Sequence, residues 1–129
     1  MPAIFLVADD SATKAAWLIR QVDKAQLGLP IHGAMTTEEA KQLIDQHTVA
    51  AAFIDFEIPS ENGPAVMSYL RSKNPDALIA CATSGSSQYY EGPARDAGAN
   101  AFVCTSGLER DVESKIKHLL IEWQIQLKQ

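Results

Sequence analysis

Short apolar runs of strand length alternate with longer segments of helical period along the whole chain. The five apolar runs cover residues 3–8, 30–35, 49–55, 77–83 and 101–104. Four of them are almost continuously apolar, which is typical of parallel strands covered on both faces. The run at 30–35 is more polar, so we expect it at an edge of the sheet. The alternation as a whole predicts an α/β protein.

Helical periodicity occupies the segments between these runs. The first helix is predicted over residues 11–26, with Gly28 as its stop signal. The second covers residues 36–47 and opens with a capping box formed by Thr36 and Glu39. The third covers residues 63–73 and ends at a turn that contains Pro75.

The last two helices are less regular at their N-terminal ends. In the fourth, residues 86–97, Gly92 and Pro93 predict a late start or a kink. The fifth runs from residue 106 to the C-terminus and begins with a second capping box, Ser106 and Glu109. Its apolar face is predicted to comprise Leu108, Val112, Ile116, Leu119, Trp123 and Leu127.

Five strand–helix units are too few to close an eight-stranded barrel, so we expect an open, doubly wound parallel sheet. Such sheets bind ligands at the carboxyl ends of their strands. At 129 residues, with 47% hydrophobic and 21% charged residues, the chain fits one domain over residues 1–129. We therefore expect no output domain.

Charge and hydropathy exclude several classes of partner. The net charge is −5 and the basic residues form no block, so nucleic acid is not an expected partner. No run reaches the roughly 18 to 20 apolar residues of a membrane span. The first apolar run is too short for a signal peptide. Cys81 and Cys104 lack metal-type spacing and are interpreted as reduced thiols of a cytoplasmic protein.

Acidic residues stand where two of the predicted strands end. Asp9 and Asp10 follow the first strand, and Asp55 ends the third. A single acid in such a place is often only a helix cap or a turn residue. Three carboxylates that converge repel one another unless a cation is bound, and Mg²⁺ prefers oxygen ligands of this kind. The sequence therefore predicts a magnesium site at the strand ends.

The spacing of these acids resembles that of receiver domains of two-component response regulators. Those domains carry an acidic pair after strand one and a phosphoacceptor Asp ending strand three. A Pro follows four residues later, and a Gly four residues after that. Here the corresponding residues are Asp9 with Asp10, then Asp55, Pro59 and Gly63. The resemblance implies a flavodoxin-like (βα)5 fold with strand order 2-1-3-4-5.

Two further positions extend the resemblance to the second half of the chain. The hydroxyl residue that ends strand four falls on Thr83, fifteen residues before Gly98 in an Ala-Gly-Ala turn. The aromatic switch residue falls on Phe102. The resemblance implies that Thr83 contacts the phosphoryl group and that Phe102 turns inward in response. Spacing alone leaves open whether Phe102 is simply a core residue.

As implied by the resemblance, the protein is a phosphoacceptor and not an enzyme. Asp55 would receive a phosphoryl group from a histidine kinase or a phosphotransfer protein. Mg²⁺ would be held by Asp9, Asp10, Asp55 and the backbone carbonyl of Glu57. The Glu57 side chain either positions a water molecule or, more commonly, points outward. A downstream protein would bind the face formed by helix four, strand five and helix five.

The chain departs from the family at the end of strand five. The family has a Lys-Pro pair there, whereas this sequence has Thr105 and Ser106. Without that lysine the site keeps a formal charge near −3. Phosphotransfer should then be slower, or the conformational switch should be uncoupled from it. Lys14, one turn into the first helix, is expected to be a solvated surface residue. The alternative is that its long stem brings the ammonium group over the acids.

Other interpretations of the sequence remain open beside that of a phosphoacceptor. The missing lysine favours a pseudo-receiver, a phosphate-independent binding module of the same fold. A cofactor binder or hydrolase is disfavoured, because glycine-rich phosphate loops and a Gly-x-Ser-x-Gly elbow are lacking. His32, His47 and His118 are expected to lie far apart, which argues against zinc or a catalytic pair. Ile121 and Ile125 lie off the main face of helix five and indicate a homodimer or partner contact, or isolated surface residues.

Overall fold

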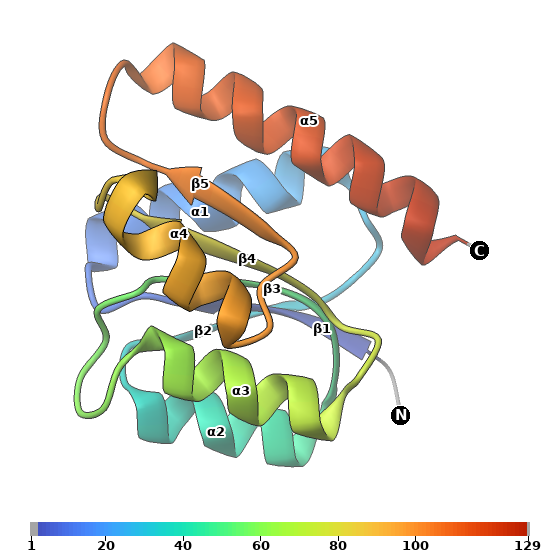
Figure 1. Ribbon diagram of the computed structural model, residues 1–129. Coiled ribbons are helices and arrows are strands. Elements are labelled where there is room, and N and C mark those ends of the chain that lie inside the picture. Colours follow the sequence, from blue (N-terminus) through green and yellow to red (C-terminus); the bar gives the residue numbers. More distant parts are fainter. Residues whose placement is uncertain (1–2, 129) are drawn as a thin grey trace.

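A parallel sheet of five strands lies between two layers of helices in the computed structural model, which describes residues 3–128 (Figure 1). The strands are β1 (Ala3–Ala8), β2 (Ile31–Ala34), β3 (Thr48–Ile54), β4 (Leu78–Thr83) and β5 (Ala101–Cys104). The helices are α1 (Ala12–Ala25), α2 (Thr37–Gln46), α3 (Gly63–Lys73), α4 (Ser87–Asp96) and α5 (Glu109–Leu127). The strand order β2-β1-β3-β4-β5 confirms the predicted doubly wound fold and the edge position of β2.

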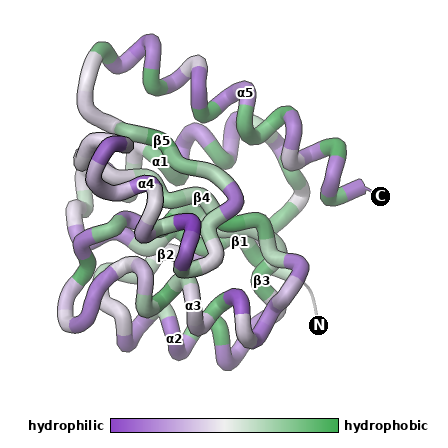
Figure 2. The backbone as a smooth tube through the Cα atoms, in the orientation of Figure 1, coloured by the Kyte–Doolittle hydropathy of each residue, from purple (hydrophilic) through white to green (hydrophobic). Residues whose placement is uncertain are grey.

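Each face of the sheet carries its own hydrophobic cluster. Helices α2, α3 and α4 cover one face, where Met67 and Leu70 are fully buried. Helices α1 and α5 cover the other face, where Phe5, Phe53 and Trp123 pack ring against ring with centroids 5.1–6.0 Å apart. Figure 2 shows the most hydrophobic backbone along the strands. Burial on both faces explains why the strands are apolar throughout instead of alternating.

Local capping signals fix where two of the helices begin. The Thr36 hydroxyl accepts a hydrogen bond from the Glu39 N–H (3.1 Å), and the Glu39 carboxylate accepts one from the Met35 N–H (2.8 Å). The Asn62 side chain caps α3 in the same way, accepting from the Ala65 N–H at 2.9 Å. Because α2 follows β2 closely and α3 follows the loop that leaves β3, these caps fix the points at which the chain enters each helix.

Three predicted features of the helix ends are wrong. Helix α1 ends at Ala25, because Gln26 and not Gly28 takes the first left-handed conformation (φ 51°). Of the late start or kink predicted for α4, the late start is wrong, because the helix begins at Ser87 and includes Pro93 on its exposed side. The second capping box does not form. Instead, Gly107 (φ 113°) turns the chain and α5 begins with Leu108 as its N-cap.

The buried face of α5 is shifted from the predicted one. Its fully buried residues are Val112, Ile116, Leu120 and Trp123. Leu119 is only half-buried, and Leu108, which precedes the helix, is 61% exposed. Ile121 and Ile125 are 48% and 59% exposed, so their predicted position off the main face is confirmed. Among the described residues, no helix combines the length and hydrophobicity of a membrane span.

Candidate functional site

Three carboxylates meet at the carboxyl ends of the two central strands. Asp9 and Asp10 follow β1, and Asp55 follows β3. The Asp55 N–H donates to the Ala8 carbonyl (2.9 Å), which ties the end of β3 to the end of β1. One carboxylate oxygen of each residue lies within 4.8 Å of the others. The predicted convergence of these acids, hereafter the acidic cluster, is therefore observed.

The members of the acidic cluster differ in burial. Asp9 is fully buried, Asp10 is exposed, and the Asp55 side chain is 13% exposed. Asp9 Oδ1 accepts a hydrogen bond from the Ser11 N–H (2.9 Å), whereas the buried Oδ2 has only the Lys14 ammonium, 2.9 Å away, as its partner. Burial raises the pKa of Asp9 above its ordinary value, and the Ser11 N–H and Lys14 only partly oppose that effect.

Lys14 reaches directly into this cluster from the first turn of α1. Its ammonium lies 2.9 Å from Asp9 Oδ2 and 3.4 Å from Asp55 Oδ1, and it donates to the Ala82 carbonyl at 2.8 Å. The expectation of a solvated surface lysine is therefore wrong. With one ammonium among three carboxylates, the site carries a formal charge near −2 and not −3. Two features of the sequence could have indicated this position of Lys14. The first helix starts close after Asp10, and a lysine side chain is long enough to reach back.

The loop between β3 and α3 is held tightly against Asp55. The Gly63 N–H donates to the Phe56 carbonyl (2.7 Å), so the loop folds back onto the end of the strand. A Cβ at position 63 would clash with the Asp55 carbonyl oxygen and lie 2.8 Å from Phe56 Cα. Glycine is therefore required here for close backbone approach, which explains its place in the motif.

The ends of β4 and β5 carry small polar groups without charge. Thr83 is buried, and its hydroxyl accepts a long hydrogen bond (3.4 Å) from the Gly85 N–H. The Thr105 N–H donates to the Thr83 carbonyl (2.8 Å). Thr105 and Ser84 line a hollow of about 530 Å³ that Lys14 also lines. The ends of β4 and β5 thus carry no charged side chain, although Lys14, Arg20 and Glu109 also line the hollow.

Two predicted residues lie at the edge of the site. Phe102 is half-buried in β5 and packs against the cluster beneath α2, α3 and α4. Glu57 is exposed, and its carboxylate accepts a hydrogen bond from the Tyr90 hydroxyl at 3.4 Å. The Tyr90 ring packs edge-on against Phe56, with centroids 4.8 Å apart. The sequence analysis did not identify Tyr90, because α4 has no motif that marks it.

The expected separation of the histidines is wrong for one pair. The rings of His32 and His47 lie 4.8 Å apart between centroids, because α2 runs back along β2 and ends beside it. His118 is exposed on α5, which covers the other face. Within residues 3–128, the acidic cluster is the one group of three or more acidic, thiol or imidazole side chains with metal-binding spacing.

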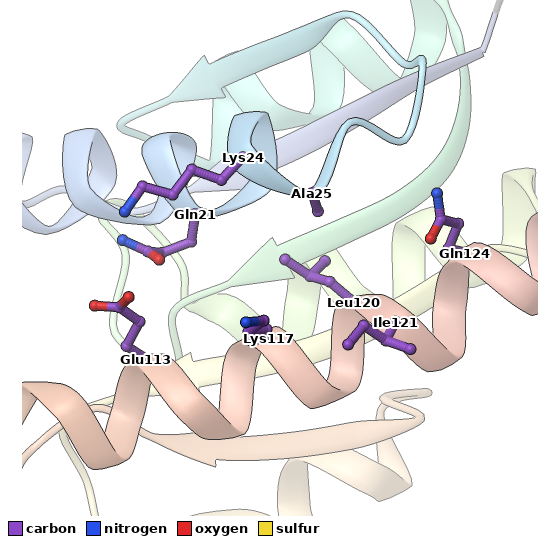
Figure 3. Close-up of a pocket in the computed structure, with 8 residues that line it drawn as sticks. All are labelled: Gln21, Lys24, Ala25, Glu113, Lys117, Leu120, Ile121 and Gln124. Carbon is purple, nitrogen blue, oxygen red and sulfur yellow. The ribbon is translucent and has the colours of Figure 1, made fainter.

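A second hollow lies away from the strand ends, between α1 and α5. It has a volume of about 260 Å³ and is lined by Gln21, Lys24, Ala25, Glu113, Lys117, Leu120, Ile121 and Gln124. Figure 3 shows the side chains of the two helices facing one another across it. Its one acid, Glu113, belongs to no metal-binding group among the described residues, so the candidate chemistry lies at the acidic cluster.

Comparison with solved structures identifies the same fold in response regulators. A receiver domain protein (CheY-like) from Methanospirillum hungatei matches with a TM-score of 0.77 and 21% identity, over 98% of this chain and 99% of that one. The receiver domain of AraT from Geobacillus stearothermophilus gives a TM-score of 0.84 and 21% identity, covering 99% and 97%.

A third structure was solved with ligands. This response regulator from Burkholderia pseudomallei contains a phosphorylated aspartic acid, a calcium ion and citrate, and it matches with a TM-score of 0.74 and 22% identity over 96% and 72%. No curated protein sequence matches the chain. The sequence profile of the response regulator receiver domain matches residues 5–116. The chain therefore belongs to the response regulator receiver domain family.

Proposed function

We propose that this receiver domain accepts a phosphoryl group on Asp55 from the phosphohistidine of a kinase or phosphotransfer protein. The observation that supports this most strongly is the acidic cluster, in which carboxylates from two strand ends lie within 4.8 Å. Asp55 is the central candidate because it is partly exposed and pairs with a cation, so it is accessible and held in place.

The same carboxylates fit a divalent cation. The buried Asp9 Oδ2 has no hydrogen-bond donor beside it other than the Lys14 ammonium, which it faces at 2.9 Å, so the surroundings of this oxygen suit a positive charge. Asp9, Asp10, Asp55 and the backbone carbonyl of Glu57 would hold Mg²⁺, a cation that prefers oxygen ligands. When bound, Mg²⁺ neutralises charge on the oxygens of the transferring phosphoryl group.

The proposed transfer needs no proton from this chain. A carboxylate oxygen of Asp55 attacks phosphorus, so a P–O bond forms while the P–N bond to the donor histidine breaks. The imidazole leaves with that electron pair and takes a proton from solvent. Asp55 becomes an acyl phosphate, and the charge of the site changes. Thr83, which ends the neighbouring strand β4, would then bond a phosphoryl oxygen.

Output would follow through the face formed by α4, β5 and α5. Movement of Thr83 toward the phosphoryl group would give Phe102 room to turn inward, because the two residues end or lie in paired strands. Tyr89 on α4 is 71% exposed and offers an aromatic contact for a downstream protein. Ile121 and Ile125 would contact a second copy of the chain or that protein, and sedimentation of an Ile121→Ser variant tests which.

The alternative is a pseudo-receiver that binds partners without phosphorylation. Thr105 favours it, since strand β5 ends without the lysine that the family normally carries. In this alternative the fold and the cation site are retained, but Asp55 is not modified. The two functions differ in one measurable property, the covalent gain of a phosphoryl group.

Mass spectrometry of the intact protein distinguishes the two functions. Wild type and Asp55→Asn are incubated with Mg²⁺ and acetyl phosphate, a small phosphodonor. We expect wild type to gain one phosphoryl mass that is absent from Asp55→Asn and from a reaction with EDTA. If wild type binds Mg²⁺ in a calorimetric titration but gains no mass, the phosphoacceptor proposal is wrong and the pseudo-receiver remains.

A further inference from the structure

The ammonium group of Lys14 is held by three oxygen atoms from three strands. Asp9 follows β1, Asp55 follows β3, and the third contact is the carbonyl of Ala82 in β4. The contact with Ala82 is a hydrogen bond, and those with Asp9 and Asp55 are ion pairs of 2.9 and 3.4 Å. The side chain is 20% exposed, unlike that of a solvated lysine. This arrangement fixes the position of the charge relative to Asp55.

Strand β5 provides no charge to the same space. Thr105, at its end, is half-buried and neutral, and it lines the hollow of about 530 Å³ together with Lys14. A longer side chain at position 105 would therefore extend into the hollow where the Lys14 stem lies. Among the described residues, Lys14 is the one cation within 4 Å of the acidic cluster.

We propose that Lys14 acts as the fixed cation of the phosphoacceptor site, supplied by α1 in place of the strand β5 lysine of the family. The inference rests on the proposed function. Before transfer, Lys14 holds the Asp55 carboxylate toward the incoming phosphorus. After transfer, it bonds a phosphoryl oxygen, which replaces the lost negative charge of Asp55 as its partner.

The balance of charge explains why the site needs this residue. With acetyl phosphate, Asp55 attacks phosphorus, the new P–O bond forms, and acetate leaves with the electrons of the broken P–O bond. The transferring group brings negative oxygens to a site whose formal charge is already near −2. Without Lys14 the donor approaches a site with one positive charge fewer, so the rate falls.

Lys14 and a divalent cation bind the same carboxylates. Removing the Lys14 charge should therefore have opposite effects on Mg²⁺ affinity and on the rate of phosphoryl transfer. Removing the ammonium group leaves Asp9 and Asp55 without a partner, so Mg²⁺ binds more tightly. The same change removes a contact to the phosphoryl group, so transfer becomes slower. A lysine that only stabilised the fold would not strengthen Mg²⁺ binding when removed.

The test compares wild type with Lys14→Met, which keeps an unbranched side chain but loses the charge. Lys24→Met is the matched control, because Lys24 is an exposed lysine in the same helix. Initial rates of labelling by acetyl phosphate come from intact mass, and Mg²⁺ affinity from calorimetry. For Lys14→Met we expect labelling roughly 100-fold slower and Mg²⁺ binding roughly tenfold tighter. Lys24→Met should change neither.

A second variant tests directly whether a lysine at the end of β5 can replace Lys14 of α1. Lys14→Met combined with Thr105→Lys should recover most of the labelling rate, since both positions line one hollow. If Lys14→Met is folded, by its thermal melting curve, and is labelled at the wild-type rate, the role of Lys14 is refuted. If wild type itself takes up no phosphoryl group, the proposed function fails instead. Unchanged Mg²⁺ affinity in Lys14→Met would show that its ammonium does not share the carboxylates.

Discussion

The carboxyl edge of the sheet, where the candidate site lies, has two sides that are built differently. The acidic side, residues 9–14 and 55–63, comes from β1, β3 and the segments that follow them, and it contains the acidic cluster and Lys14. The polar side, residues 83–90 and 102–107, comes from β4 and β5, with small uncharged groups at the strand ends. Charge is thus confined to one side, where backbone packing is tight and the side chains are held in place.

The comparison indicates what each side contributes. On the acidic side, Asp55 is fixed by a backbone hydrogen bond to β1, an ion pair to Lys14 and the close approach of Gly63. On the polar side, the one hydrogen bond of the Thr83 hydroxyl is long, and the hollow beside it is open. The rigid acidic side is suited to positioning the groups for phosphoryl transfer, and the loosely held polar side is suited to a change of conformation.

The largest effect is expected from a methyl group added to the acidic side. Gly63→Ala would force the backbone of Asp55 and Phe56 to shift, since its Cβ has no space. We expect the free energy of unfolding to fall by about 3 kcal/mol or more. Urea denaturation followed by circular dichroism measures it.

Gly92→Ala is the matched control, because a Cβ at that exposed position meets no atom within 4 Å apart from its chain neighbours and the backbone of its own helix. The higher helix propensity of alanine is opposed by crowding against Pro93, so stability should stay within about 1 kcal/mol of wild type. Equal losses in the two variants would contradict the view that the acidic side is the tightly packed one.

A smaller effect is expected from neutralising the buried acid. Burial raises the pKa of Asp9 above its ordinary value of 3.8, so this carboxyl favours the folded state only while it is protonated. That contribution is present at low pH and is lost as the pH rises through the folded-state pKa. At pH 7 without divalent cations, Asp9→Asn should therefore raise the free energy of unfolding.

The same variant should lose the stabilisation that Mg²⁺ gives to wild type, because one ligand is weakened. Denaturation curves at pH 7, with EDTA and with Mg²⁺, give both quantities. A less stable Asp9→Asn in EDTA would indicate that the Lys14 ion pair outweighs the cost of burial.

The smallest effect on the fold is expected on the polar side, from the thiol of Cys104. A hydrogen bond with Ser106 lowers the pKa of Cys104, whereas burial raises the pKa of Cys81 in β4 to about 12. At pH 8 a disulfide reagent should modify one thiol per native chain, and the second only after unfolding. Cys104→Ser should remove the fast reaction and change stability by less than about 0.5 kcal/mol. Two thiols that react equally in the native protein would contradict this assignment.

Most of the fold could be predicted from local patterns. The apolar runs located all five strands, and β1 and β5 have the predicted bounds. The same patterns misplaced details that depend on neighbouring segments. Leu120 and not Leu119 is buried on α5, because the sheet surface beneath the helix selects the face. The His32–His47 contact was missed because it depends on where α2 ends relative to β2.

The candidate site divides in the same way. Asp9, Asp10 and Asp55 were found from the sequence, because a residue that follows a parallel strand must lie at the carboxyl edge of the sheet. The position of the Lys14 ammonium could not be found from the sequence. A lysine stem has many rotamers, and the sequence carries no information on which one is occupied. Only the neighbouring ends of β3 and β4, brought beside α1 by folding, select the one that reaches Asp55 and Ala82.

The sequence by itself thus determined the order of strands and helices, the two apolar faces and the edge at which the acids lie, since hydrophobic periodicity and strand direction are local properties. The tertiary structure alone decided which cation faces those acids. That choice depends on distances between residues remote in the chain, and electrostatic interactions are set by those distances. Position 14 gained its place in the site only when three strand ends and one helix came together.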